Sequence, residues 1–331
     1  MLNSKIIGVG HHVPERVITN HDLEQWMDTS DEWIRERTGI ITRHWVKEGD
    51  TVSGLGLEAA KKALDHAGLK AEDIDFIIFA SMASDHDFPG AGCFLQEKMG
   101  LPGVPSMDIR NACTGFIYAL STADKFIKTG TYKNILVVGA EIQSTGLDLS
   151  TRGRDMAVLF GDGAGAVVVT ATEEKDKGIL TTHLHADGRF AKKLWCEWPS
   201  VTHHPRITKE MCETDRIYPK MEGRFVFKYA VTYFPQVVQE ALEATGYSVE
   251  DIDLFIPHQA NQRITEAVAQ RLGLPWEKVV SNIHKYGNTT AASIPIAMSE
   301  AFQEGRIKDG DLVCLAAFGA GFTWGSVLMR W

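Results

Sequence analysis

The sequence predicts a layered α/β fold built from two related halves. Short, continuous apolar runs are typical of strands buried on both faces, and five are found: FIIFA (76–80), ILVVGA (135–140), AVVVT (166–170), LFIPH (254–258) and LVCLAAF (312–318). Helical patterns, such as those over 115–129 and 261–272, alternate with these runs. A third observation is that the first part of the chain resembles the second.

The internal repeat consists of three echoes. EDIDFIIFASMA (72–83) resembles EDIDLFIPHQA (250–260), GTYKNILVVGAE (130–141) resembles GRIKDGDLVCLAAFG (305–319), and FGDGAGAVVV (160–169) resembles FGAGFTWGSVL (318–328). One such similarity is easily fortuitous, but three in the same order at similar offsets indicate a duplication. We therefore expect an N-terminal half over 1–172, a connecting segment over 173–220 and a C-terminal half over 221–331.

The connecting segment contains a stretch without a clear period. Residues 188–220 combine tryptophans, prolines, cysteines and adjacent histidines, which predicts a long loop or lid. The spacing of Cys196, His203, His204 and Cys212 matches no standard pattern of metal ligands, so no metal site is expected.

Composition and charge limit the class of protein. The chain has 331 residues, 44% of them hydrophobic, and a net charge of −9, which repels nucleic acid and anionic membranes. The five cysteines, an odd number, are widely spaced, which argues against a disulfide framework. The first residues lack the apolar core of a signal peptide, and no apolar run approaches the ~20 residues of a membrane helix. A cytoplasmic protein is expected, without membrane insertion or nucleic-acid binding.

Three residues line up when the halves are superimposed. Cys113 and Asn288 each precede a small-residue helix, and His258 follows a predicted strand. A helix N-terminus carries unpaired N–H groups and partial positive charge, which should lower the pKa of the thiol of Cys113. His258 and Asn288 could both donate hydrogen bonds to one developing oxyanion.

Each residue taken alone has a simpler interpretation. A buried cysteine is usually a small apolar residue, a histidine after a strand is usually a satisfied core residue, and an asparagine before a helix is usually a cap. FGDGAGA (160–166) could be only a tight turn. The joint arrangement across the repeat is what favours a nucleophilic site.

At these residues the chain resembles β-ketoacyl-acyl-carrier-protein synthase III. The resemblance covers nearly the whole chain and rests on TSDEWIRERTGI (29–40), the cysteine block at 111–117, FGDGAGA (160–166), HLHADG (183–188), PHQANQRI (257–264), YGNTTAAS (286–293) and AFGAGFTWGS (317–326). It implies a thiolase-like fold, a duplicated α/β/α/β/α five-layer sandwich, in a homodimer. It also implies a catalytic triad of Cys113, His258 and Asn288.

The reaction that the resemblance implies is a decarboxylative Claisen condensation. Cys113 would take an acyl group from acetyl-CoA or another short acyl-CoA, and malonyl-acyl-carrier protein would then lose carbon dioxide and attack the acyl-cysteine. Such a reaction initiates fatty-acid synthesis. It requires no metal or redox cofactor, and the coenzyme A thioester is a substrate and not a cofactor. Two alternatives remain: a relative that primes a special lipid or secondary metabolite, or transfers acyl groups without decarboxylation, and a non-catalytic binding paralogue, which the intact triad disfavours.

The resemblance also implies roles for residues around the triad. The loop of Gly319, Ala320 and Gly321 would contribute to an oxyanion hole. Ala320 stands where the family often has glycine, so its φ would be more restricted. The coenzyme A site would include Trp33, which would stack on the adenine with Arg152 on the other face, and Arg37, Thr38, Gly153, Asn261 and Phe318. Phe88 would reach the acyl pocket of the partner subunit. Lys228, Arg263 and Arg271 would dock the acidic carrier protein.

Two further features bear on these roles. Thr29 and Glu32 predict a capping box at the start of the helix that carries Trp33. Asn111 and Thr114 stand where the family has smaller residues, and the 188–220 loop is longer than usual, so both could alter the choice of starter acyl group.

Overall fold

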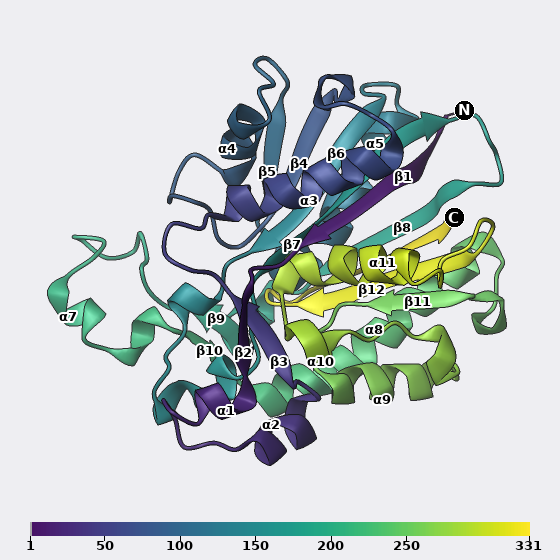
Figure 1. Cartoon of the computed structure of the whole chain (residues 1–331). Coiled ribbons are helices and arrows are strands. Elements are labelled where there is room, and N and C mark those ends of the chain that lie inside the picture. The colour runs from purple at the N-terminus through teal and green to yellow at the C-terminus, as the bar shows by residue number, and fades with distance from the viewer. Residues whose placement is uncertain (1) are drawn as a thin grey trace.

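The computed structural model describes residues 2–331 and has five layers, in which helices and two sheets alternate (Figure 1). The first sheet has the strand order β1 (Asn3–His12), β7 (Gly163–Thr172), β6 (Asn134–Glu141), β4 (Phe76–Ala80) and β5 (Ser106–Ile109). The first two pairs are antiparallel and the last two are parallel.

The second sheet repeats this pattern. Its order is β8 (Gly178–Ala186), β13 (Thr323–Arg330), β12 (Leu312–Gly319) and β11 (Leu254–Pro257), with two antiparallel pairs followed by a parallel pair. A single parallel bridge between Phe255 and Val279 stands where the first sheet has β5. The duplication predicted from the three echoes is therefore present in the fold.

The division of the chain differs from the prediction in one respect. β8 lies within the predicted connecting segment, 173–220, yet it pairs along its length with β13. The second half therefore begins at Gly178 and not at residue 221. The sequence GILTTHLHA hides this strand because most of its residues are only partly buried, so it has no continuous apolar run.

Helices fill the other three layers. The middle layer is α5 (Gly115–Lys128) and α11 (Ser293–Gln303), which pack between the two sheets. The outer layers are α3 (Val52–Ala67) and α4 (Ala91–Lys98) on the first sheet, and α8 (Gly223–Thr245) and α9 (Gln262–Leu272) on the second. In β4, Phe76 and Ile78 face the middle layer while Ile77 and Phe79 face the outer one, so the strand is apolar throughout.

Smaller elements gather at one end of the sheets (Figure 1). They are β2 (Arg16–Thr19), α1 (Asn20–Leu23), α2 (Asp31–Thr38), β3 (Thr42–Trp45), α6 (Arg154–Ala157) and α10 (Ile283–Tyr286). Together they enclose a fourth apolar cluster, which includes Ile34, Trp45 and Ile283. No helix in residues 2–331 is long and apolar enough to cross a membrane.

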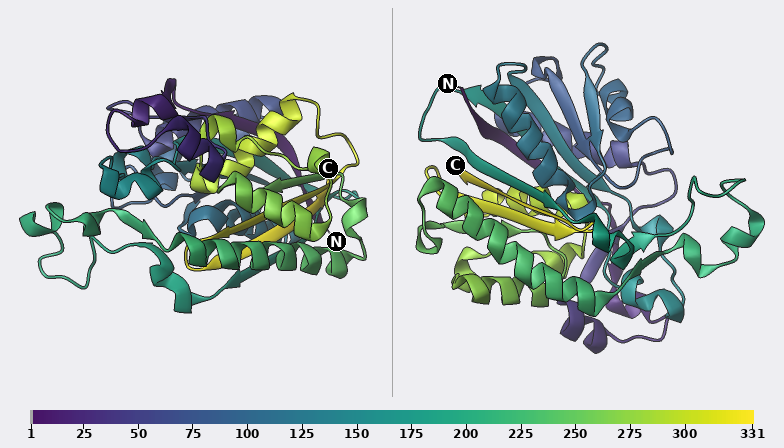
Figure 2. Two further views of the ribbon diagram at one scale, coloured as in Figure 1. Left: turned by 90° about the horizontal axis from the view of Figure 1, so that it is seen from below. Right: turned by 180° about the vertical axis from the view of Figure 1, so that it is seen from behind.

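Residues 188–220 project from the body as an arm (Figure 2). The arm has only short elements: β9 (Leu194–Cys196) pairs with β10 (Pro219–Met221), and α7 (Lys209–Cys212) lies near its tip. Arg206 of the arm pairs with Asp87, with Nη2 and Oδ1 3.1 Å apart. Within residues 2–331 no three His, Cys, Asp or Glu side chains are placed to hold a metal, and Nε2 of His203 instead accepts a hydrogen bond from the indole of Trp198 (2.7 Å).

Candidate active site

Cys113 lies where the chain turns into α5. It belongs to a 3₁₀ turn, Ala112–Thr114, that runs directly into the helix at Gly115, as the sequence predicted. Ala112 has a φ of +46°, a left-handed conformation that costs a non-glycine residue about 1 kcal/mol or more. The strained residue directly precedes the thiol, which is 8% exposed.

The thiol of Cys113 is more basic than the sequence suggested. Burial, followed by the carboxyl group of Glu141, raises its pKa to about 12, against the opposing effect of the N–H groups of Ala320 and of Cys113 itself. The prediction that the helix N-terminus would leave a lowered pKa was therefore wrong. Desolvation outweighs the helix terminus, and the cysteine is a thiol at neutral pH.

The loop after β12 packs directly on the nucleophile. A Cβ atom at Gly319 would lie 2.6 Å from Cβ of Cys113 and 3.1 Å from its Sγ, so only glycine fits this position. The N–H of the next residue, Ala320, points at the thiol. Ala320 is not strained, because Ala112 and Thr290 are the only non-glycine residues among the described ones with positive φ.

His258 follows β11 and is held by one hydrogen bond of its backbone and one of its ring. Its N–H donates to the carbonyl of Ala316 (2.9 Å), and its Nδ1 lies 2.7 Å from Oγ of Ser293. The side chain of the next residue, Gln259, is anchored by the carbonyls of Pro257 and Val280. Burial lowers the pKa of His258 to about 3, so the imidazole is neutral, and its buried Nε2 has no hydrogen-bond partner among the described residues.

Asn288 belongs to the second half but is held by the first. Its N–H donates to the carbonyl of Leu159 (2.8 Å), and its carbonyl accepts from the N–H of Gly161 (3.1 Å). The side-chain Oδ1 accepts from the N–H of Thr290 (2.9 Å), which leaves the amide NH₂ available. Thr290, φ +51°, precedes α11 in a 3₁₀ turn that repeats the turn at Cys113.

One cavity of about 840 Å³ contains all three residues. Cys113, His258 and Asn288 line it together with Phe318 and Gly319. The three residues that the sequence analysis singled out are thus far apart in the chain and line one cavity in the structure. Gly139 of β6 allows the turn after Asn288 to pack closely on the first sheet, because a Cβ there would lie 2.4 Å from the carbonyl oxygen of Ala291 in that turn.

Trp33 lines the other end of the cavity, on α2. The helix begins one residue later than predicted: its N-cap is Ser30, whose Oγ accepts from the N–H of Trp33 (3.1 Å), and not Thr29. Ser30 has the extended backbone that an N-cap requires, whereas Oγ1 of Thr29 is buried without a partner among the described residues.

Two arginines lie against the ring of Trp33. The guanidinium carbons of Arg37 and Arg154 lie 4.5 and 4.9 Å from the ring centroid. Arg152 instead donates to Asp148 (2.7 Å), four residues earlier, and neither it nor Gly153 lines the cavity. The carboxylate of Asp148 thus holds Arg152 away from the cavity lining, and the placement of Arg152 across the adenine from Trp33 stays a prediction.

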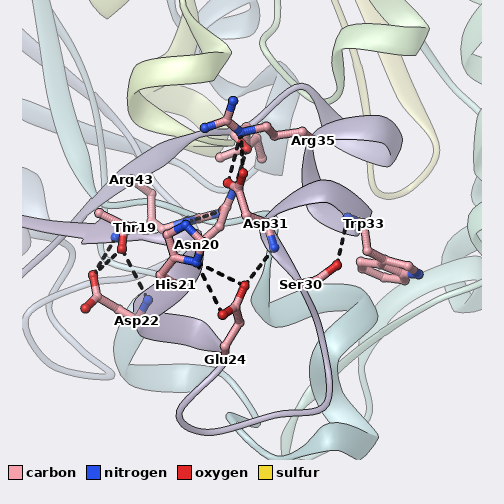
Figure 3. A network of polar contacts seen from close by, with 11 residues as sticks. Thr19, Asn20, His21, Asp22, Glu24, Ser30, Asp31, Trp33, Arg35 and Arg43 are labelled. Atoms are coloured by element: carbon pink, nitrogen blue, oxygen red, sulfur yellow. Dashed lines mark hydrogen bonds and ion pairs between the residues drawn. The ribbon is translucent and has the colours of Figure 1, made fainter.

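A buried polar network fixes the position of α2 (Figure 3). Arg43 is fully buried and donates to Oδ1 of Asn20 (2.8 Å) and to the carbonyl of Val158 (2.9 Å). Asn20 donates in turn to Asp31 of α2 (2.9 Å). Because Val158 lines the cavity and directly precedes Leu159, whose carbonyl binds the backbone of Asn288, Arg43 connects α2 to the segment that holds Asn288.

Asn261 and Thr38 occupy the predicted positions. Asn261 caps α9 through Oδ1, which accepts from the N–H of Arg263 (2.9 Å), and its Nδ2 donates to the carbonyl of Arg37 (2.8 Å). Thr38 also lines the cavity and is nearly buried. Asn261 thus joins the two helices on either side of the cavity mouth.

The mouth is rich in arginine. Arg37, Arg154, Arg224 and Arg263 all line it, with Asp155 as the one carboxylate among its lining residues. Of the three residues predicted to dock a carrier protein, only Arg263 lines the cavity. Lys228 is exposed on α8, and Arg271 is held at one end of α9 by the carbonyl of Val231 (2.7 Å).

Phe88 does not line the cavity of its own chain. Its side chain is 82% exposed, and it lies beside Asp87, the residue that pairs with the arm. Val201 and Ile207 of the arm are 84% and 60% exposed. An aromatic and two aliphatic side chains are thus presented together with the Asp87–Arg206 contact, outside the site.

Sequence reasoning missed several residues that build the site. Arg154 and Arg224 line the cavity, Glu141 lies beside the thiol, and Gln259 and Ser293 hold the histidine. Glu141 did leave a signal, because a carboxylate ends the apolar strand ILVVGA. The other four have no distinguishing pattern, since their roles depend on the packing of separate segments.

Comparison with known proteins agrees with this geometry. Residues 107–188 match the family described as 3-oxoacyl-[acyl-carrier-protein (ACP)] synthase III, and residues 242–331 match its C-terminal model. The chain is 47% identical over 330 residues to beta-ketoacyl-[acyl-carrier-protein] synthase III 1 of Bacillus anthracis, covering 100% of this chain and 99% of the relative. It is 46% identical over 327 residues to the synthase III of Salmonella arizonae, covering 99% of each.

A solved structure extends the likeness to three dimensions. The crystal structure of 3-oxoacyl-[acyl-carrier-protein] synthase III from Aquifex aeolicus superposes with a TM-score of 0.91 at 47% identity, covering 99% of this chain and 100% of that one. The thiolase-like fold class predicted from the sequence is confirmed by this match. The chain therefore belongs to the 3-oxoacyl-[acyl-carrier-protein] synthase III family.

Proposed function

We propose that the chain condenses a short acyl-CoA with malonyl-acyl-carrier protein, which gives a 3-oxoacyl-acyl-carrier protein and carbon dioxide and initiates fatty-acid synthesis. The observation that carries this function is the meeting of Cys113, His258 and Asn288 in one cavity. A thiol opposite two neutral hydrogen-bond donors suits acyl transfer followed by stabilisation of an enolate.

The first step is an exchange of thioesters. The sulfur of Cys113 attacks the acyl carbon, the bond from that carbon to the sulfur of coenzyme A breaks, and the thiol proton ends on the departing sulfur. The N–H groups of Cys113 and Ala320 lie close enough to the thiol to hold the oxyanion that forms. One thioester replaces another, so the step needs no external energy.

The second step makes the carbon–carbon bond. The malonyl carboxylate leaves as carbon dioxide, and the resulting enolate carbon attacks the acyl-cysteine. The bond from the acyl carbon to sulfur then breaks, and the sulfur takes up one proton. His258 and Asn288 donate to the malonyl thioester oxygen as charge develops on it. The thiol, the two substrates and one proton taken from solvent in the second step balance the reaction, so the proposal includes no metal or redox cofactor.

The cavity mouth suits a donor that carries phosphate groups. Trp33 offers an aromatic face for a base, and the guanidinium groups of Arg37, Arg154, Arg224 and Arg263 offer charge-assisted hydrogen bonds to phosphate. Coenzyme A has both features. The acyl-carrier protein is acidic, as this chain is, so we assign its docking to the exposed basic side chains beside the mouth, Arg263 and Lys228.

We also propose that the chain works as a homodimer. Phe88 is an exposed aromatic that serves no purpose in its own chain, and β5 is an open edge of the first sheet. A partner that covers this edge would bury Phe88 near its own acyl site. Light scattering on the wild type and Phe88→Ala tests this: a monomeric wild type would contradict the dimer.

Intact-protein mass spectrometry tests the central proposal. Wild-type protein incubated with a panel of acyl-CoAs should gain one acyl mass on Cys113, and that mass identifies the starter. Cys113→Ser should gain none and should not condense. Asn288→Ala should still be acylated but should release carbon dioxide from malonyl-acyl-carrier protein ~10²–10³-fold more slowly. Acylation at another residue, or undiminished decarboxylation by Asn288→Ala, would contradict the proposal.

A further inference from the structure

A serine–histidine pair lies behind the triad. Oγ of Ser293, the first residue of α11, is 2.7 Å from Nδ1 of His258. Ser293 and His258 are 2% and 1% exposed, so water cannot substitute for either partner. The other ring nitrogen, Nε2, is buried without a partner among the described residues and belongs to a side chain that lines the cavity.

The hydrogen bonds around Ser293 determine which atom carries each proton. Its Oγ accepts a long hydrogen bond from the N–H of Gln259 (3.4 Å). Among the described residues, Nδ1 of His258 is the one acceptor within reach of its hydroxyl hydrogen. A buried hydroxyl hydrogen without an acceptor costs about 1–3 kcal/mol. The arrangement that satisfies every group therefore has the hydroxyl donating to Nδ1.

A neutral imidazole that accepts at Nδ1 carries its proton on Nε2. We propose that Ser293 is a positioning residue that fixes His258 as the Nε2–H tautomer, so that a hydrogen-bond donor points into the cavity. This inference rests on the proposed function, and it assigns to Ser293 a role in the decarboxylation step. The backbone N–H of Thr290 acts on Asn288 in the same way, because it occupies Oδ1 and leaves the amide NH₂ for the substrate.

The opposite tautomer would not support the reaction. If His258 carried its proton on Nδ1, the hydroxyl hydrogen of Ser293 would lose its acceptor and Nε2 would present a lone pair. A lone pair repels a developing oxyanion, whereas an N–H group stabilises it. The serine thus separates the two half-reactions: decarboxylation requires Nε2–H, but acylation of Cys113 does not, since the thiol proton goes to the departing sulfur.

The chain provides a matched control. Ser299 lies on the same helix, α11, is fully buried, and has its Oγ 2.9 Å from Nδ1 of His11. This second serine–histidine pair lies outside the residues that line the cavity. Ser299→Ala removes the same kind of hydrogen bond from the same helix, so it reports any general loss of packing.

Two measurements on Ser293→Ala, Ser299→Ala and Ser293→Thr test the proposal. In ¹⁵N-histidine spectra, with His258→Ala used to assign the signal, wild type and Ser293→Thr should show His258 protonated at Nε2, and Ser293→Ala should show a mixture. Decarboxylation of malonyl-acyl-carrier protein should fall about 10- to 100-fold in Ser293→Ala, the size expected when a group that orients a reactive histidine is lost. Acylation by acyl-CoA should stay within twofold, and Ser299→Ala should resemble wild type in both assays.

Three results would overturn the inference: a wild-type His258 protonated at Nδ1, an unchanged tautomer in Ser293→Ala, or equal losses in acylation and decarboxylation. The wild-type spectrum decides the question even if Ser293→Ala does not fold. Failure of the proposed function is distinguishable, because it would show as a wild type that neither acylates nor decarboxylates, while the tautomer would still be read directly.

Discussion

Gly319→Ala is the substitution whose effect follows most directly from the structure. The added methyl carbon would lie 2.6 Å from Cβ of Cys113, 3.1 Å from Sγ and 3.2 Å from the backbone nitrogen. Carbon atoms at ordinary contact are about 3.5–4 Å apart, so one of the two segments must move by roughly 1 Å. Neither can yield easily, because Gly319 ends β12 and the first contact is with Cβ and not with the end of a flexible chain.

A displacement of this size at a nucleophile costs about 10²-fold in rate. We therefore expect acylation of Gly319→Ala by acyl-CoA to slow by about two orders of magnitude, as followed by intact mass against time. Overpacking should also lower the free energy of unfolding by about 1–3 kcal/mol, seen as a melting temperature a few degrees lower. Gly146→Ala is the control, since an added Cβ there meets nothing within 4 Å. Acylation of Gly319→Ala within twofold of the wild-type rate would refute the reasoning.

Three further predictions concern charge. Burial raises the pKa of Glu141 to about 8, from an ordinary 4.5, so the folded chain keeps this proton while the unfolded chain loses it. The contribution of this group to the free energy of unfolding is then full below pH ~4.5 and falls as the pH rises to ~8, by up to ~1.4 kcal/mol per pH unit. Glu141→Gln should remove this fall, which is measured as the melting temperature against pH. Parallel curves of melting temperature for variant and wild type would contradict this. Arg154→Ala should raise the KM for acyl-CoA several-fold more than Arg152→Ala, because only Arg154 lies against Trp33, and equal effects would argue against that placement. Lys228→Glu should raise the KM for malonyl-acyl-carrier protein at low salt, where surface charges are least screened, and leave acylation unchanged; salt-independent kinetics would exclude docking there.

The repeat made the fold predictable from the sequence. Because equivalent strands recur in the same order, the five continuous apolar runs located five strands of the two sheets, β4, β6, β7, β11 and β12, and the positions of Cys113 and Asn288 followed from the superposition. β8 escaped because its residues are half-buried and polar, so it has no apolar run. A continuous apolar run reveals strands that are buried on both faces, such as β11, and misses a strand that is only partly buried, such as β8.

The chemistry of the site was less predictable than its location. The pKa of Cys113 depends on how deeply the thiol is buried and on Glu141, which lies at the end of β6 and not in the turn that carries Cys113. The contact of Arg154 with Trp33 could not be predicted either, because it arises while the neighbouring Arg152 is held by the carboxylate of Asp148. Such properties arise when separate segments meet, and no local pattern records them.

The way in which Asn288 is held has a consequence for recombination between relatives. Its backbone is bonded to Leu159 and Gly161 of the other half, while Gly319 of the second half touches Cys113 of the first. A chimera that joins the first half of one relative to the second half of another must therefore match in two respects. It must preserve the apolar core between the sheets, to which both halves contribute, and it would still be inactive unless these few contacts across the seam also matched. Sequence change in either half is thus constrained by the other half, in folding and in chemistry.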